Sequence, residues 1–354
     1  MNVSDMRMIY INLGEECNFS CKYCSQKALI TEAAIHKGED VADKVVNFLQ
    51  DISEFRNSSS RLRIRFTGGE PLIYFDKLKQ IVERVNRDYE WIVITNGSLI
   101  TDEQIEFFNR YDFHVGISND GPNTELTRSV NLLEDSKFLE RIAKIKNLRF
   151  VCVLTAYNAN YKEVLSYFKE KLLPYGKVPY VSLNPVYDTG SIEEELIRFD
   201  WEAFEQSTRH FFDSITLETF SNDTPERYLL IRYLNRVLEY FNNPTMLEYT
   251  GCGADYDTLS MDSIGNVFAC HNTSIKIGDL GTPLEELQAY FKSKKDFSRH
   301  LSENCVSCYG RIICGGSCPF VGEQSRKLYY CRLHKTIIEN VLNTLVRLGM
   351  CCHE

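Results

Sequence analysis

The stretch MIYINLGEECNFSCKYC, residues 8–24, joins a β-strand pattern directly to a loop of three cysteines. Its first part, Met8–Leu13, is β-branched and aromatic, which predicts a strand. Cys17, Cys21 and Cys24 follow with the spacing C-x3-C-x2-C, which a shuffled chain of this composition would rarely produce. Three thiolates can hold a four-iron cluster while one iron stays open to chelate a small molecule. A zinc site completed by a distant residue is the alternative.

The residues after this loop alternate between short strands and amphipathic helices up to about residue 190. This alternation is typical of a parallel sheet or barrel built from βαβ units. Further strands are expected at Leu62–Thr67, Trp91–Thr95, Phe113–Ser118, Leu148–Leu154 and Tyr180–Asn184. Because apolar residues recur at helical spacing, helices are expected at Val41–Phe55, Tyr74–Asp88, Asp102–Asn109, Glu134–Ile145 and Tyr161–Lys171.

Glycine, asparagine and aspartate residues follow several of these strands. Gly68-Gly69-Glu70-Pro71 comes directly after the second strand, and Asn119-Asp120-Gly121-Pro122 after the fourth. In parallel α/β folds the carboxyl ends of the strands form the edge at which ligands bind. Two glycines permit a close approach of the backbone, and a glutamate accepts hydrogen bonds from an ammonium group. We therefore expect a ligand site at this edge.

Composition and charge exclude several classes of protein. The chain has 354 residues, 44% of them hydrophobic and 25% charged, as in an ordinary globular protein of about two domains. Its net charge of −9 disfavours nucleic acid as a partner and favours a neutral or basic substrate. No apolar run is long enough to span a membrane and no signal peptide is evident, so we expect a cytoplasmic protein. Its 13 cysteines therefore indicate metal or cluster ligands rather than disulfides.

The second half of the chain has a different pattern. Helical periodicity continues at about Asp200–Ile215 and Pro225–Asn242, which we interpret as a helical bridge. From about residue 250 cysteines dominate and secondary-structure signals are weak, which predicts a small domain held together by metal rather than by an apolar core. These cysteines include a C-x2-C-x5-C-x3-C run over residues 305–318, whose spacing by itself also suits a tetrahedral zinc ion.

The loop Cys17-Asn-Phe-Ser-Cys21-Lys-Tyr23-Cys24 resembles the cluster-binding signature of radical S-adenosylmethionine (SAM) enzymes, including the aromatic Tyr23 before the third cysteine. The resemblance implies an α/β fold, a partial (β/α)6 TIM barrel followed by a small iron–sulfur domain. It also implies a [4Fe–4S] cluster on Cys17, Cys21 and Cys24 with SAM bound beside it, and Tyr23 as one of the residues that contact SAM.

Further motifs agree with this family. Gly68-Gly69-Glu70-Pro71 is similar to its GGEP motif, so Gly68, Gly69 and Glu70 are implied contacts of the methionine amino group of SAM. Ser118 and Arg128 are implied contacts of the sugar and carboxylate of SAM. Asp120 is a further candidate, with a role in a turn as the alternative.

The C-terminal cysteines resemble the SPASM extension of radical SAM enzymes across seven positions. The likeness implies two auxiliary [4Fe–4S] clusters, which makes three clusters in all. Their ligands would be Cys252, Cys270 and Cys318 for the first cluster, and Cys305, Cys308, Cys314 and Cys331 for the second. Because Gly253–Ala269 contains no further cysteine, the first cluster keeps an open iron or takes another ligand such as Asp255. The expected domains are a radical SAM core (1–195), the bridge (196–248) and a SPASM domain (249–354).

The resemblance implies an oxidoreductase that cleaves SAM reductively to a 5′-deoxyadenosyl radical and oxidatively modifies a peptide or protein. The product would carry a thioether or carbon–carbon crosslink or an oxidised side chain. An electron donor such as flavodoxin or ferredoxin is an implied partner. Because a strand begins at Met8, we expect no N-terminal leader-peptide domain, and either a separate leader-binding protein or recognition by the barrel alone. No nucleic acid or membrane is expected as a partner.

Other functions remain open. Formylglycine formation, as in sulfatase maturation, is associated with an Asp after the second SPASM cysteine, where this chain has His271. His271 itself is a candidate base near the substrate, or a structural residue. Dehydrogenation of a small molecule such as an amino sugar needs no leader domain. A zinc or iron–sulfur redox or interaction protein is the non-enzymatic alternative, and it would not need the GGEP sequence. Outside the motifs, Cys152 is expected to be a buried core thiol, and Cys351 and Cys352 a tail without a role.

Overall fold

The structure of the protein is a computed structural model. It describes residues 6–25, 41–55, 61–85, 88–188, 192–242, 258–272, 275–293, 305, 307–314, 321, 325 and 329–350. Within these residues no helix combines the length and apolarity needed to cross a membrane.

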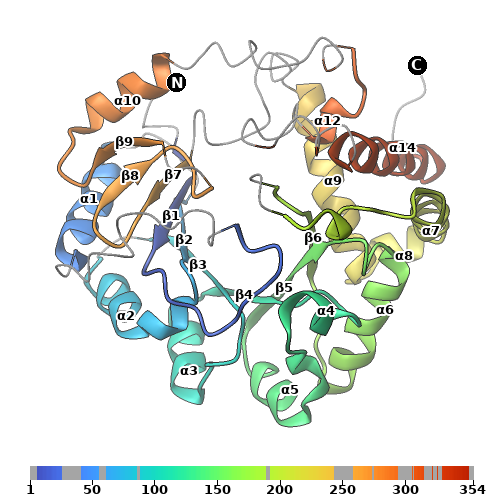
Figure 1. The fold of residues 1–354 in the computed structure, drawn as a ribbon, viewed down its shortest axis with the longest axis horizontal. Coiled ribbons are helices and arrows are strands. Elements are labelled where there is room, and N and C mark those ends of the chain that lie inside the picture. Colours follow the sequence, from blue (N-terminus) through green and yellow to red (C-terminus); the bar gives the residue numbers. More distant parts are fainter. Residues whose placement is uncertain are drawn as a thin grey trace.

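One curved sheet runs through the molecule (Figure 1). Its strands follow the spatial order β6-β5-β4-β3-β2-β1-β7-β8-β9. Strands β1 to β6 pair in parallel with their neighbours, which confirms the α/β class and the parallel sheet expected from the sequence. The strands are β1 (Met8–Asn12), β2 (Arg63–Thr67), β3 (Glu90–Thr95), β4 (His114–Ser118), β5 (Asn147–Leu154), β6 (Val181–Pro185), β7 (Thr258–Met261), β8 (Asn266–Phe268) and β9 (Lys276–Asp279).

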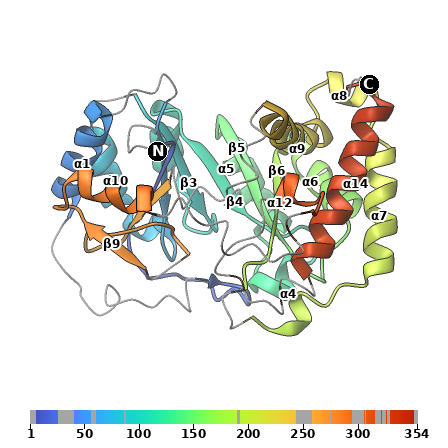
Figure 2. The same ribbon diagram turned by 90° about the horizontal axis from the view of Figure 1, so that it is seen from above.

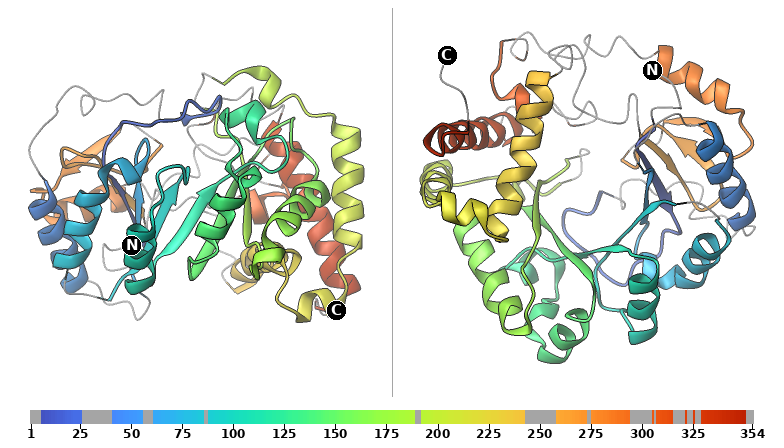
Figure 3. Two further views of the ribbon diagram at one scale, coloured as in Figure 1. Left: turned by 90° about the horizontal axis from the view of Figure 1, so that it is seen from below. Right: turned by 180° about the vertical axis from the view of Figure 1, so that it is seen from behind.

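Helices surround the strands on the outer side of this curve (Figures 1 and 3). The helices expected in the first half all form, and a short additional one, α4, follows β4. They are α1 (Ala42–Phe55), α2 (Phe75–Arg84), α3 (Asp102–Arg110), α4 (Thr124–Arg128), α5 (Ser136–Ile142) and α6 (Tyr161–Leu172). The later helices are α7 (Trp201–Asp213), α8 (Leu217–Ser221), α9 (Pro225–Asn242), α10 (Leu284–Ser293), α12 (Arg311–Cys314) and α14 (Cys331–Arg347).

Alternate residues of each strand point to opposite faces of the sheet. On β2, Ile64 and Phe66 are fully buried on the helix-covered face, whereas Arg65 and Thr67 are half-buried on the concave face. Cys152 on β5 is also fully buried, which confirms its expected place in the core. The helix-covered face is therefore apolar, and polar residues collect on the concave face.

The C-terminal region is more regular than the sequence led us to expect. Strand β7 pairs in parallel with β1 and extends the main sheet. Helix α14 buries Leu333, Ile337 and Val341 in the main apolar core and packs against α7, α9 and α12. The expectation of a region with little secondary structure and without an apolar core was wrong. Leu333, Ile337 and Val341 are spaced four residues apart in the sequence, which is typical of an amphipathic helix.

The segment expected as a third domain contributes to both ends of the sheet. Strands β7 to β9 and α10 lie beside β1, and α12 and α14 lie beyond β6, next to α7 and α9 (Figures 1 and 2). Gly265 occupies the β7–β8 turn with a φ of 93°, and its neighbour Asp262 accepts hydrogen bonds from two backbone N–H groups of this turn. Gly265 therefore has a structural role in this hairpin.

Candidate functional site

The three-cysteine loop, residues 13–25, follows β1 at the carboxyl edge of the sheet. Cys17 is exposed, and Cys21 and Cys24 are half-buried. Burial raises the pKa of the Cys21 thiol, the Arg128 guanidinium opposes this shift, and Cys24 and Cys17 add to it. The mutual effect means that the three thiols lie close enough together to interact electrostatically. The structure thus brings all three predicted ligands to one place.

The paired glycines after β2 pack against the backbone of this loop. The Gly69 N–H donates to the Gly14 carbonyl oxygen at 2.9 Å, and the Glu70 N–H donates to the Glu16 carbonyl oxygen at 2.8 Å. A Cβ atom at Gly69 would lie 2.2 Å from the Glu16 carbonyl oxygen, so no other residue fits at this position without a shift of backbone. We expected the two glycines to let the backbone come close to a ligand. They also let it come close to the backbone of the three-cysteine loop.

The Glu70 side chain connects the ends of β2 and β3. Its Oε1 accepts hydrogen bonds from the Leu72 N–H at 3.0 Å and the Thr95 hydroxyl at 2.6 Å, and its Oε2 accepts from the Asn96 N–H at 2.7 Å. Only 1% of Glu70 is exposed. Burial raises the pKa of this carboxyl, and the three hydrogen bonds partly oppose that shift. Glu70 therefore holds the ends of β2 and β3 together at the edge where we predict the ligand. Among the described residues, its Oε2 accepts one hydrogen bond, from the Asn96 N–H.

Residues after β3 reach the three-cysteine loop from another side. The Asn96 amide donates to Asn18 Oδ1 at 2.8 Å, and the Asn18 amide in turn donates to the Ser98 hydroxyl at 2.8 Å. Asn96 also lowers the pKa of the Cys17 thiol, against the larger effect of burial, which raises it. The β3 end therefore fixes the loop and influences one of its thiols.

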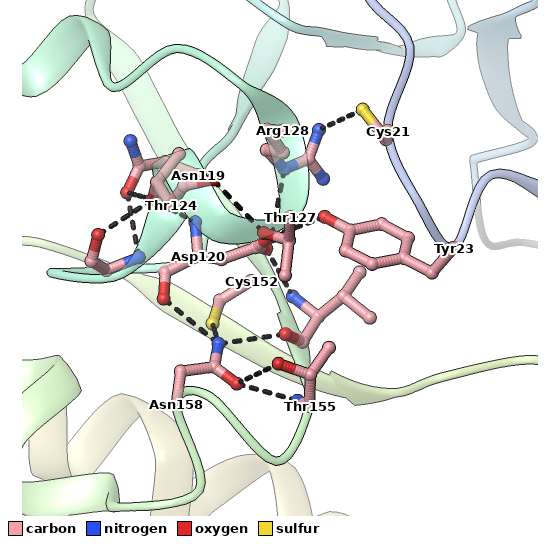
Figure 4. A network of polar contacts seen from close by, with 12 residues as sticks. Cys21, Tyr23, Asn119, Asp120, Thr124, Thr127, Arg128, Cys152, Thr155 and Asn158 are labelled. Atoms are coloured by element: carbon pink, nitrogen blue, oxygen red, sulfur yellow. Dashed lines mark hydrogen bonds and ion pairs between the residues drawn. The ribbon is translucent and has the colours of Figure 1, made fainter. Parts of the chain in front are cut away.

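Asp120 is the centre of a buried polar network after β4 (Figure 4). Its Oδ2 accepts hydrogen bonds from the Tyr23 hydroxyl at 2.5 Å and the Thr127 hydroxyl at 2.6 Å, and forms an ion pair with Arg128 Nε at 3.2 Å. Its Oδ1 accepts from the Val153 N–H on β5 at 2.9 Å. With 1% exposure and four donors, this carboxylate is an internal acceptor.

Arg128 links this network to the cysteines. Its Nη1 donates to Cys21 Sγ at 3.6 Å, and its guanidinium lies 5.2 Å from the centre of the Tyr23 ring. Burial lowers the pKa of Arg128, but the Asp120 carboxylate, Tyr23 and Cys21 together hold the pKa above its ordinary value. Nη2 forms no hydrogen bond with any residue that the structure describes, so it remains available to a carboxylate ligand.

Two other predicted contacts of SAM have different surroundings. The Tyr23 hydroxyl is occupied by Asp120, and burial and that carboxylate raise its pKa well above the ordinary value. Tyr23 therefore anchors the loop. Ser118, the last residue of β4, is half-buried on the concave face, and its hydroxyl forms no hydrogen bond with the described residues. Its hydroxyl is free for a ligand.

Sequence reasoning missed several members of the Asp120 network. The Thr127 hydroxyl on α4 donates to the Asp120 carboxylate. The Asn158 amide, which follows β5, donates to the Asp120 carbonyl oxygen and to the Cys152 sulfur (Figure 4). Thr124 and Asn119 close the turn after β4 through a hydrogen bond of 3.0 Å. The one sequence signal was the Asn-Asp-Gly-Pro turn, which places Asp120 at the strand end and says nothing about its distant donors.

The C-terminal cysteines are only partly described. Cys252 and Cys318, together with Asp255, Cys351 and Cys352, lie outside the described residues. Cys314 ends α12 and Cys331 begins α14, which pack on each other, while Cys305 and Cys308 precede α12. No disulfide joins any two of the cysteines that the structure describes.

Cys270 and His271 lie next to the N-terminal half of the sheet. The imidazole of His271 stacks on the Tyr10 ring of β1, with 4.1 Å between the ring centres, and Cys270 Sγ lies 3.9 Å from its Nδ1. Burial and, after it, the Arg65 guanidinium lower the pKa of His271 to about 3. An imidazole with this pKa is a weak base near neutral pH.

The donor set of the three-cysteine loop suits a cluster better than a single ion. The loop supplies three thiolates. A structural zinc ion takes four protein ligands, whereas three thiolates bind three irons of a cubane and leave the fourth iron open. The hydrogen bond from Arg128 to the Cys21 sulfur is also typical of cluster sites.

Comparison with known families identifies the class of protein. Residues 11–171 match the Radical SAM superfamily. The match includes the three-cysteine loop, the paired glycines, and the Asp120 network up to Asn158. Residues 11–171 therefore form a radical SAM domain, and the protein is a radical SAM enzyme, a class that binds a [4Fe–4S] cluster and SAM.

Similarity to individual proteins extends over almost the whole chain. The radical SAM cyclopropyl synthase TigE of Paramaledivibacter caminithermalis is 24% identical, over 95% of this chain and 74% of that protein. A cysteine-type anaerobic sulfatase-maturating enzyme of Clostridium perfringens is 25% identical, over 94% of this chain and 95% of that protein. The structure of native anSMEcpe with bound AdoMet and the Cp18Cys peptide has a TM-score of 0.72 at 20% identity, covering 97% of this chain and 98% of that one. This structural likeness confirms the partial-barrel fold.

We expect Asp120→Asn to lower the free energy of unfolding by about 3–5 kcal/mol, because it leaves the buried Arg128 guanidinium without its counter-charge. Urea denaturation of the iron-loaded protein measures this loss. Asp112→Asn is the matched control, since Asp112 pairs with Lys146 on the exposed surface, where such pairs contribute little. Equal losses in the two variants would contradict the assigned role of Asp120.

Proposed function

We propose that this enzyme oxidatively modifies a peptide or protein substrate, by forming a thioether or carbon–carbon crosslink or by oxidising a side chain. The observation that carries the proposal is the length of the similarity, which extends beyond the radical SAM segment through the cysteine-rich region to peptide- and protein-modifying enzymes. A structure of SuiB bound to its precursor peptide SuiA, with a TM-score of 0.60, adds a second peptide-bound neighbour with the same fold.

The proposed site assigns a role to each group of residues. Cys17, Cys21 and Cys24 would hold the [4Fe–4S] cluster, which together with SAM supplies a 5′-deoxyadenosyl radical that abstracts hydrogen from the substrate. Gly68 and Glu70 would receive the amino group of SAM at the β2 end. This support is chemical, since Glu70 Oε2 accepts a single hydrogen bond from the protein.

At the β4 end, Ser118 and Arg128 would bind SAM through the groups that the protein leaves unpaired. The Ser118 hydroxyl faces the concave side, and Arg128 Nη2 has no described partner while Nε and Nη1 are fixed by Asp120 and Cys21. Asp120 and Tyr23 orient this arginine and hold the loop. A guanidinium with two fixed nitrogens loses little conformational entropy when it binds a carboxylate.

The auxiliary sites and partners belong to the same proposal. Cys252, Cys270 and Cys318 would hold one further cluster, and Cys305, Cys308, Cys314 and Cys331 another, which together would accept electrons from the oxidised substrate. A flavodoxin- or ferredoxin-like donor would reduce the first cluster. The domain division at residues 195 and 248 remains our prediction, as does recognition of the substrate with a separate leader-binding protein.

Formylglycine formation is the second candidate. The similarity to the Clostridium perfringens sulfatase-maturating enzyme over 94% of this chain favours it. The chemistry at residue 271 does not, because His271, with a pKa of about 3, stands where an Asp was expected for that reaction. A neutral imidazole stacked on Tyr10 is a poor replacement for a carboxylate base.

Replacing Cys17, Cys21 and Cys24 together by Ala is expected to abolish release of 5′-deoxyadenosine from SAM, because the radical-generating cluster loses its protein ligands. The assay is anaerobic incubation with dithionite followed by chromatography. Cys351→Ala is the control, since this cysteine is not a proposed ligand, and it should keep the activity. Cleavage by the triple variant would show that the cluster is assigned to the wrong cysteines.

The Cys314→Ala variant should contain less iron than the wild type, because the second auxiliary cluster loses a ligand. We expect α14 to remain folded, since Leu333, Ile337 and Val341 anchor it in the apolar core. Iron analysis and circular dichroism measure the two effects separately. An unchanged iron content would count against this auxiliary site.

A peptide encoded beside the gene should lose two hydrogen atoms on incubation with the enzyme, SAM and a reductant, if a crosslink or an oxidised side chain forms. Mass spectrometry of the peptide detects the change, and fragmentation locates the modified residue. The triple cysteine variant serves as the control. A change confined to a small molecule such as an amino sugar would replace the peptide proposal by the dehydrogenation alternative.

A further inference from the structure

The concave face of the sheet carries positive charge in a protein whose net charge is −9. Arg65 on β2 and Arg149 on β5 both lie on this face, as the burial of their strand neighbours shows. Neither arginine forms an ion pair with any residue that the structure describes. The local charge is thus opposite to the charge of the whole chain, from which we expected a neutral or basic substrate.

Arg65 has the surroundings of a binding group. Its Nη1 donates to the Tyr10 hydroxyl at 3.4 Å, and its guanidinium lies 5.1 Å from the centre of the Tyr10 ring. Its Nε is buried and has no hydrogen-bond partner in the described part of the chain. A buried N–H of a charged group is costly to leave unpaired, and native proteins rarely do so without a functional reason.

The neighbours of Arg65 hold it in place without neutralising it. Tyr10 lies opposite Arg65 on the neighbouring strand β1. The His271 ring stacks on the Tyr10 ring, with 4.1 Å between the ring centres. A tyrosine and an imidazole supply stacking and hydrogen bonds but no negative charge. Among the residues that the structure describes, the fixed guanidinium therefore has no counter-anion.

The position of Arg65 relates it to the reaction site. It lies two residues before the end of β2 and, at about 3.3 Å per residue, roughly 7 Å below the carboxyl edge where the three-cysteine loop and Glu70 meet. A group that enters the concave face from that edge passes the reaction site before it meets Arg65. A long acidic side chain or a chain terminus has the shape for this.

We propose that Arg65 binds a carboxylate of the substrate, so that the enzyme selects peptides with an acidic side chain or a free C-terminus beside the modified residue. This inference rests on the proposed peptide-modifying function. Arg149 adds a second positive charge to the same face, and Tyr10 fixes the Arg65 guanidinium in the orientation that accepts a carboxylate.

The test uses the iron-loaded enzyme with SAM, under anaerobic conditions, and three pools of random octapeptides. Two pools are acetylated and amidated and have a fixed central Glu or a fixed central Gln. The third contains no acidic residue and has a free C-terminal carboxylate. Peptides retained by the enzyme on rapid gel filtration are quantified by mass spectrometry.

Wild-type enzyme should retain the Glu pool or the free-carboxylate pool about tenfold better than the Gln pool, as a charge-assisted hydrogen bond requires. The pool that is enriched identifies the source of the carboxylate. Arg65→Gln should abolish the preference, and Arg65→Lys should keep part of it, because lysine provides the charge without the planar fork. Arg61→Gln is the matched control, because it removes the same positive charge from an exposed position, where Arg61 pairs with Asp88.

Equal retention of all three pools by the wild type would overturn the inference, as would a preference that survives in Arg65→Gln. If Arg65→Gln does not fold, as judged by circular dichroism, the conservative Arg65→Lys variant decides, and an undiminished preference in that variant counts against Arg65. Retention of no peptide, by an enzyme that still cleaves SAM, would contradict the peptide-modifying function and this inference with it.

Discussion

The buried carboxylate of Asp120 is the interaction on which the site depends. Its donors come from the three-cysteine loop, α4 and β5, so one side chain holds together segments that are far apart in the sequence. A carboxylate with 1% exposure is stable only when all its donors are present. The position of the loop therefore depends on β4, β5 and α4, and the geometry of the cysteines follows from the packing of the barrel.

Glu70 has the same function at the neighbouring strand ends. It connects β2 to β3, while the glycines before it let the backbone contact the three-cysteine loop. Residues that the family resemblance assigns to SAM thus also form the scaffold for the cluster ligands. Loss of activity on substitution of Glu70 or Asp120 would consequently not separate a contact with SAM from a loss of structure, whereas Ser118 has no such second role among the described residues.

The concave face and the C-terminal segment show how tertiary structure changes conclusions drawn from composition. The chain is acidic as a whole, but alternation along the strands places Arg65 and Arg149 on the face opposite the apolar core. Similarly, the described part of the cysteine-rich region packs with the rest of the chain, because β7 pairs with β1 and α14 joins the main core. The net charge of a chain therefore does not give the charge of a particular surface, and its cysteine content does not show what stabilises a particular segment.

The sequence by itself determined the class of the protein and most of the regular structure. Periodicity located β1 to β6 and the helices between them, and the spacing of Cys17, Cys21 and Cys24 predicted a cluster site, because both are local properties of the chain. Only the tertiary structure decided that Asp120 is an internal acceptor, that Arg128 donates to Cys21, and that Arg65 lacks a counter-charge. Each of these depends on partners distant in the sequence, and a pattern of neighbouring residues contains no information on which distant donors will meet a buried acceptor.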